Sequence, residues 1–156
     1  MSPNNDFLAV QDFYSDVVSW CFGCGRLNPV GHHFRTRWDG DHTLTTYTPH
    51  VEHTAIPGFV YGGLIASLID CHSTGSAALA LYRRDGHELG EPEPIPRCMT
   101  ASLTVDYLKP TPLGPELTVQ GTIAEVGGRK VVVKSQLFAE GIVVVSAAVV
   151  AVMARL

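Results

Sequence analysis

The sequence lacks the features that mark a membrane, secreted or nucleic-acid-binding protein. It has no run of about 18 apolar residues, the length that a membrane helix needs, so no transmembrane helix is expected. Its first 20 residues contain no lysine or arginine, which argues against a signal peptide. The formal net charge is −4, so neither nucleic acid nor a membrane surface is an expected partner.

Cysteine is also scarce. Four cysteines at uneven spacing do not make a disulfide framework, and a reducing cytoplasm is the simplest expected location. The 156 residues suffice for one domain with a real core. We therefore expect a single domain over residues 1–156, with an N-terminal helix and a Cys-x-x-Cys-Gly loop within about 1–31.

Turn residues and hydrophobic periodicity divide the chain into elements. A short amphipathic helix is expected over 6–20, and a loop over 21–31. Two strands, 33–38 and 43–48, flank an Asp-Gly-Asp turn, and a long helical pattern covers about 60–82. Four β-branched runs follow, at 99–108, 116–126, 130–140 and 142–153.

The long helical pattern predicts the fold. One of its stripes is apolar, and the other consists of small residues around a single carboxylate, so both faces suit a buried helix. The element order is two strands, one buried helix and four further strands. This order predicts an α+β hotdog fold, in which a six-stranded antiparallel sheet wraps around one long central helix.

The start of this helix carries the most informative motif. Gly62 and Gly63 fall in its first turn, where backbone N–H groups lack helical partners and can approach a developing negative charge. Asp70 follows two turns later, on or near the same face, and a mid-helix carboxylate among apolar neighbours is costly unless it is paired or used. The alternative is a structural Asp70 that caps a neighbouring loop, with glycines that merely permit close packing.

Segment 57–70 resembles the His-Gly-Gly, six residues, Asp signature of PaaI-like (phenylacetate-pathway type) hotdog thioesterases. Segment 100–110 (TASLTVDYLKP) and the Gly-Gly-Arg-Lys turn at 127–130 are similar too, and the resemblance covers about residues 20–155. It implies an acyl-CoA thioesterase without cofactor or metal, assembled as a homodimer or homotetramer. The carried-over roles place a general base or nucleophile at Asp70, an oxyanion-binding N–H at Gly62, and an assisting hydroxyl at Thr100, reaching across from the partner subunit.

Two positions depart from that family's pattern. Tyr61 stands where the family has the histidine, and Ala55 stands where many relatives have a loop asparagine. Both changes leave the carboxylate and the oxyanion site in place. Four residues are expected along the substrate: His53, Tyr61, Gly63 and Thr74. His53 is either a polar group that faces the substrate or an ordinary surface histidine.

Three cations are candidates to bind the phosphates of coenzyme A: Lys109, Arg129 and Lys130. The alternative is that they are ordinary solvated turn residues. Two other functions stay open. One is a hotdog dehydratase or hydratase that pairs His53 with Asp70. The other is a non-catalytic acyl-CoA-binding protein.

The Cys21-Phe-Gly-Cys24-Gly25 segment suggests a metal site, with His32 and His33 as further ligands. Adjacent histidines do not easily converge on one ion, so a tight turn is the favoured interpretation and no metal is expected. His72, two residues beyond Asp70, is predicted to be structural or to lie at a subunit contact.

Overall fold

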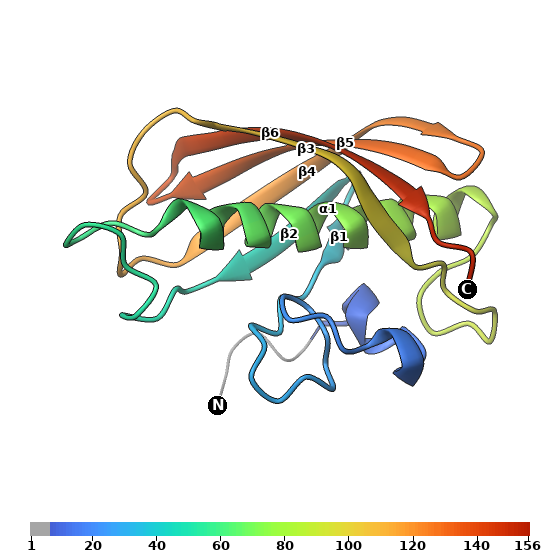
Figure 1. Cartoon of the computed structure of the whole chain (residues 1–156). Helices are drawn as coiled ribbons and strands as arrows, with labels where there is room; N and C mark the ends of the chain where they lie inside the picture. Colours follow the sequence, from blue (N-terminus) through green and yellow to red (C-terminus); the bar gives the residue numbers. More distant parts are fainter. Residues whose placement is uncertain (1–6) are drawn as a thin grey trace.

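Residues 7–156 are described by the computed structural model, and they form one long helix and a six-stranded antiparallel sheet (Figure 1). The helix α1 spans Gly62–Arg84. The strands are β1 (Arg37–Asp39), β2 (His42–Tyr47), β3 (Cys98–Tyr107), β4 (Leu117–Gly127), β5 (Lys130–Ala139) and β6 (Ile142–Met153). Their order in the sheet is β1-β2-β4-β5-β6-β3, which places β3 at one edge. The predicted hotdog fold is confirmed.

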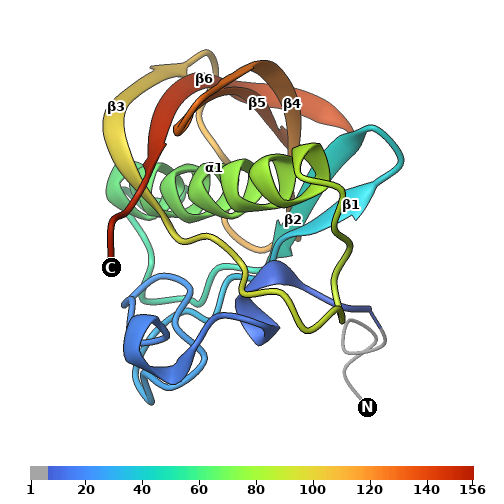
Figure 2. The same ribbon diagram turned by 90° about the vertical axis from the view of Figure 1, so that its right-hand side faces the viewer.

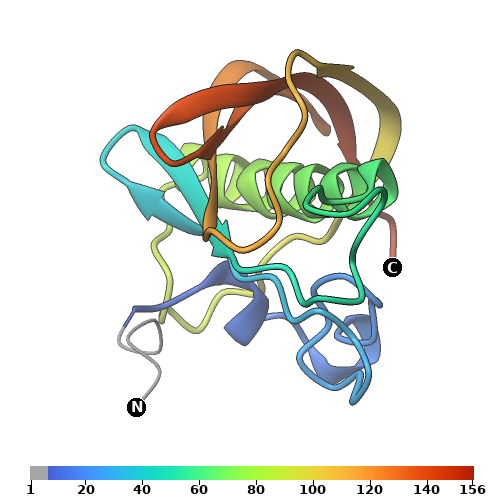
Figure 3. The same cartoon turned by 90° about the vertical axis from the view of Figure 1, so that its left-hand side faces the viewer.

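The sheet arches over α1 in all three views (Figures 1, 2 and 3). Leucines of the helix such as Leu64 and Leu68 pack against inward-facing residues of the later strands, including Leu137 and Val149, and all four are 0% exposed. By length and composition α1 could cross a membrane, but 83% of its most apolar stretch is buried inside the protein. Its apolar character therefore serves the core.

A buried histidine joins α1 to β2. His72 is 0% exposed, and its Nδ1 lies 2.8 Å from the hydroxyl of Thr45. Its Nε2 lies 3.4 Å from the hydroxyls of Thr43 and Ser76. Burial lowers the pKa of His72 from 6.5 to about 3. The imidazole is therefore neutral in the folded protein, and its role is structural, as predicted.

This histidine should make stability depend on pH. In the unfolded chain His72 binds a proton below about pH 6.5, whereas the folded protein keeps it neutral down to about pH 3. The free energy of unfolding should therefore fall as pH decreases through this window, by about 2 kcal/mol at pH 5 from this group alone.

Denaturant titrations of wild type and His72→Gln at pH 7 and pH 5 test the prediction. The variant starts from a lower stability, but it should lose about 2 kcal/mol less than wild type between the two pH values. An equal loss in both proteins would show that His72 does not carry this pH dependence.

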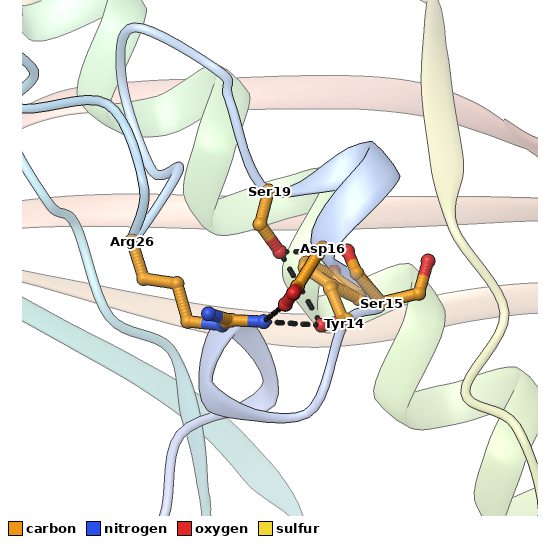
Figure 4. Close-up of polar contacts among 5 residues, drawn as sticks. All are labelled: Tyr14, Ser15, Asp16, Ser19 and Arg26. Carbon is orange, nitrogen blue, oxygen red and sulfur yellow. Dashed lines mark hydrogen bonds and ion pairs between the residues drawn. The ribbon is translucent and has the colours of Figure 1, made fainter.

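The N-terminal helix expected over 6–20 is wrong. The described part of this segment contains two short 3-10 helices, η1 (Val10–Asp12) and η2 (Asp16–Val18), and residue 6 lies outside the described residues. Polar side chains take up the backbone carbonyls that a longer helix would use (Figure 4). The Arg26 guanidinium donates to the carbonyl of Tyr14 and pairs with Asp16, and the Ser19 hydroxyl donates to the carbonyl of Ser15.

The N-terminal segment instead covers the side of α1 that the sheet leaves open (Figure 2). Val10 and Tyr14 are buried against Ala77, Ala78 and Leu81 of the helix. The first strand, Arg37–Asp39, differs from the predicted 33–38. At the predicted start, His33 has a φ of 57°, which is incompatible with extended backbone. The N-terminal segment thus covers the core on the side of α1 opposite the sheet, without adding a strand to the sheet.

Candidate active site

The site is built around Asp70, which α1 presents toward the edge strand β3. The Thr100 hydroxyl donates a hydrogen bond to the Asp70 carboxylate, so the two residues predicted to act together are in contact. The resemblance places this hydroxyl on the partner subunit, whereas here both residues belong to one chain. Asp70 is partly exposed, and reactants can therefore reach its carboxylate.

A cavity of about 460 Å³ opens beside this pair. Thr74, one helical turn beyond Asp70, lines it too, and its hydroxyl donates to the carbonyl of Cys71. The remaining lining residues come from the N-terminal segment, α1, β3 with the residue before it, and the C-terminus: Val17, Val18, Trp20, Cys21, Cys71, Arg97, Cys98, Met99, Ala154 and Leu156. Most of these side chains are apolar, which suits an acyl or pantetheine chain. Sequence patterns could not find them, because they are far apart in the chain.

Gly62 begins α1, with Tyr61 as the preceding extended residue. The Tyr107 hydroxyl donates to the Gly62 carbonyl at 2.8 Å, which fixes the helix start against β3. Nothing in the sequence marks Tyr107 for this role beyond its place in a strand. Gly63 has a packing reason for lacking a side chain, because a Cβ there would overlap the Tyr61 ring.

Gly62 and Asp70 lie in different cavities of the chain. Gly62 lines a cavity of about 380 Å³ together with Phe59, Tyr107 and Lys109, and that cavity is separate from the one around Asp70. Eight residues of α-helix separate the two backbones by about 12 Å. A thioester carbonyl needs both groups within about 3 Å of the reacting atoms. One chain therefore does not bring both groups to one carbonyl.

His53 lies in the loop before α1 and packs among rings. Its ring centroid lies 5.0 Å from that of His50 and 5.2 Å from that of His32, and its Nδ1 accepts a hydrogen bond from the His50 backbone. Partial burial, followed by the nearby His50, lowers the pKa of His53. Among the described residues that line the Asp70 cavity, His53 does not occur. The chain does not bring the proposed His53–Asp70 pair together.

The three candidate phosphate-binding cations are split between the two ends of α1. Lys109 lies at the Gly62 end, whereas the β4–β5 turn that carries Arg129 and Lys130 reaches the other end, where Arg84 donates to the Gly128 carbonyl (Figure 1). The Arg129 guanidinium donates to the Met153 carbonyl, and Lys130 lies 3.8 Å from the Glu125 carboxylate. The three cations do not form one cluster within a chain.

Comparisons with known proteins identify the family. Residues 57–146 match the thioesterase superfamily. Over 81 residues, 52% of this chain, the sequence is 38% identical to the acyl-coenzyme A thioesterase THEM4 of Xenopus laevis. The chain spans 30% of the length of that relative.

Solved structures cover more of the chain. A thioesterase superfamily protein from Shewanella loihica is 44% identical and matches 90% of this chain and 98% of its own, with a TM-score of 0.69. The PaaI protein of Escherichia coli shares the fold, with 15% identity, a TM-score of 0.63, and coverage of 80% of this chain and 81% of its own. The resemblance found in the sequence is thus confirmed, and the chain belongs to the thioesterase superfamily.

Proposed function

We propose that this protein hydrolyses an acyl-CoA thioester to a free acid and coenzyme A. One observation carries the proposal: the Asp70 carboxylate, hydrogen-bonded by Thr100, faces a mostly apolar cavity on the central helix of a thioesterase-superfamily domain. The relative from Xenopus laevis is an acyl-coenzyme A thioesterase, which agrees with coenzyme A as the leaving group.

Hydrolysis needs an activated nucleophile and a stabilised oxyanion. As a general base, Asp70 takes a proton from a water molecule while the water oxygen attacks the carbonyl carbon. The tetrahedral oxyanion is stabilised by the Gly62 N–H at the helix N-terminus. Its collapse breaks the C–S bond, and the proton held by Asp70 passes to the departing thiolate. As a nucleophile, Asp70 would attack the carbonyl carbon and expel the coenzyme A thiolate by C–S cleavage. Water would then hydrolyse the resulting acyl anhydride to the free acid and the Asp70 carboxylate, and the released proton would pass to the thiolate.

The separation of Gly62 from Asp70 supports a site shared between two copies of the chain. If a two-fold axis sets two α1 helices antiparallel, Gly62 of one copy lies opposite Asp70 of the other, and two equal sites result. The exposed edge strand supports the same assembly, since Met99, Leu103 and Tyr107 of β3 are 64%, 38% and 51% exposed. We infer a homodimer, alone or within a homotetramer.

Mixing two inactive variants tests the shared site. Asp70→Asn and Gly62→Pro homodimers should each be nearly inactive. A heterodimer of the two has one site with Gly62 from the first copy and Asp70 from the second, so about half of the wild-type rate per dimer should return. A site contained in one chain would stay broken in both copies, and an inactive heterodimer would therefore overturn the shared site.

A panel of acyl-CoA esters assayed for thiol release tests the reaction itself. A hydratase would consume enoyl absorbance without releasing thiol. An acyl-CoA-binding protein would bind the esters without turnover, and its binding would survive loss of Asp70. Thiol release from none of the esters would overturn the proposed hydrolysis.

A further inference from the structure

Three of the four cysteines converge beside the candidate active site. Cys21 and Cys24 belong to the N-terminal loop, and Cys71 follows Asp70 on α1. The sulfur atoms of Cys21 and Cys71 lie 3.9 Å apart, and all three sulfurs lie within 4.8 Å of one another. Thiolates at the Zn–S distance of about 2.3 Å in a tetrahedral site are about 3.8 Å apart. The sulfur spacing is therefore close to that of a zinc site.

The loop is shaped to bring its sulfurs to the helix. A Cβ at Gly23 would overlap the Cys71 sulfur, so only glycine allows this approach. Gly25 donates its N–H to the Cys21 carbonyl at 2.7 Å, which closes the turn between the two loop cysteines. The turn therefore holds Cys21 and Cys24 where their sulfurs lie within 4.8 Å of the Cys71 sulfur.

Charge and burial also fit a bound cation. Three thiolates and one divalent ion leave one negative charge, and the Arg97 guanidinium lies 3.9 Å from the Cys24 sulfur, where it can balance that charge. Cys24 and Cys71 are buried, whereas Cys21 is partly exposed and lines the cavity of about 460 Å³. An ion can therefore enter from the cavity.

We propose that Cys21, Cys24 and Cys71 bind one zinc ion, with the fourth coordination position open toward the cavity. The ligand set differs from the one weighed on the sequence, because the two histidines are engaged elsewhere. The His32 ring stacks on Phe34, with ring centroids 5.0 Å apart, and the His33 Nε2 lies 2.5 Å from the Asn28 carbonyl oxygen. The ion would fasten the N-terminal loop to α1 next to Asp70, independently of the reaction catalysed.

Titration of the reduced, chelator-treated full-length protein with Zn²⁺ alone tests the site. We expect uptake of one ion per chain and a rise in Tm of about 5–10 °C when free Zn²⁺ is about 100-fold above Kd. Co²⁺ in place of Zn²⁺ should give thiolate-to-metal charge-transfer absorption. Alkylation of Cys21 by iodoacetamide should slow when Zn²⁺ is present, because the metal occupies the thiolate.

Variants separate two of the proposed ligands from the fourth cysteine. Cys24→Ser and Cys71→Ser should each weaken Zn²⁺ binding by at least about 100-fold, while Cys98→Ser should bind as wild type. Cys98 is a matched control, because it is buried, lines the same cavity and is not part of the cluster. No uptake by the reduced wild-type protein would overturn the proposal, and so would equal weakening in all three variants. The proposed hydrolysis does not depend on the ion, so the prediction of thiol release from acyl-CoA would stand if this test failed.

Discussion

Asp70→Asn should lower kcat for thioester hydrolysis by about 10²–10⁴-fold if Asp70 is the general base, and by more if it is the nucleophile. The amide keeps the size of the side chain and can still accept the hydrogen bond from Thr100, so the fold should survive. It cannot take a proton from water. KM should change little, because the lost interaction belongs to the reaction and not to binding. Steady-state thiol release measures both constants.

Two control variants sharpen this experiment. Asp41→Asn removes an exposed carboxylate from the β1–β2 turn and should keep the wild-type rate. Thr100→Ala should have a milder effect than Asp70→Asn, because water can replace a hydroxyl that only orients the carboxylate. A folded Asp70→Asn protein with the wild-type rate on its best substrate would refute the mechanism.

Gly62→Pro should lower kcat by about 10²–10³-fold, the cost of one lost oxyanion donor. Proline has no N–H, and the first position of a helix is the place where it is best tolerated. Gly62 holds that position in α1, after Tyr61. The helix should therefore form, while the group that faces the thioester oxygen is lost.

Gly62→Ala is the matched comparison. Its Cβ lies 3.3 Å from the Tyr107 ring and hydroxyl, a close contact that proline makes too, but alanine keeps the N–H. Alanine should therefore retain most of the activity that proline abolishes, and circular dichroism should show α1 intact in both variants. Equal losses in the two variants would assign the effect to crowding at Tyr107 instead of the missing donor.

The strands and the central helix could be predicted from local pattern. The later strands are long β-branched runs separated by Gly-Gly, Pro-rich or Gly-containing turns, and the prediction of 142–153 matches β6 at both ends. The helix prediction, 60–82, differs from α1 by two residues at each end. Such elements are readable because each stabilises itself through the periodic burial of its own residues.

The N-terminal segment is different, because its conformation depends on distant partners. Its apolar spacing predicted a helix, but Arg26 donates to its Tyr14 carbonyl, and Gln11 accepts a hydrogen bond from the Thr36 backbone at 2.7 Å. These partners lie 12 and 25 residues apart in the chain. Local periodicity contains no information about them.

The candidate site divides in the same way. The sequence alone singled out Asp70 and Gly62 as candidates, because a carboxylate and paired glycines in one buried helix are unusual enough to stand out, and the family resemblance added Thr100. Only the tertiary structure placed Thr100 on Asp70, separated Lys109 from Arg129, and brought Cys71 to the loop cysteines. Those relations depend on how α1, β3 and the N-terminal loop pack together, and packing between segments far apart in the chain leaves no periodic trace in the sequence.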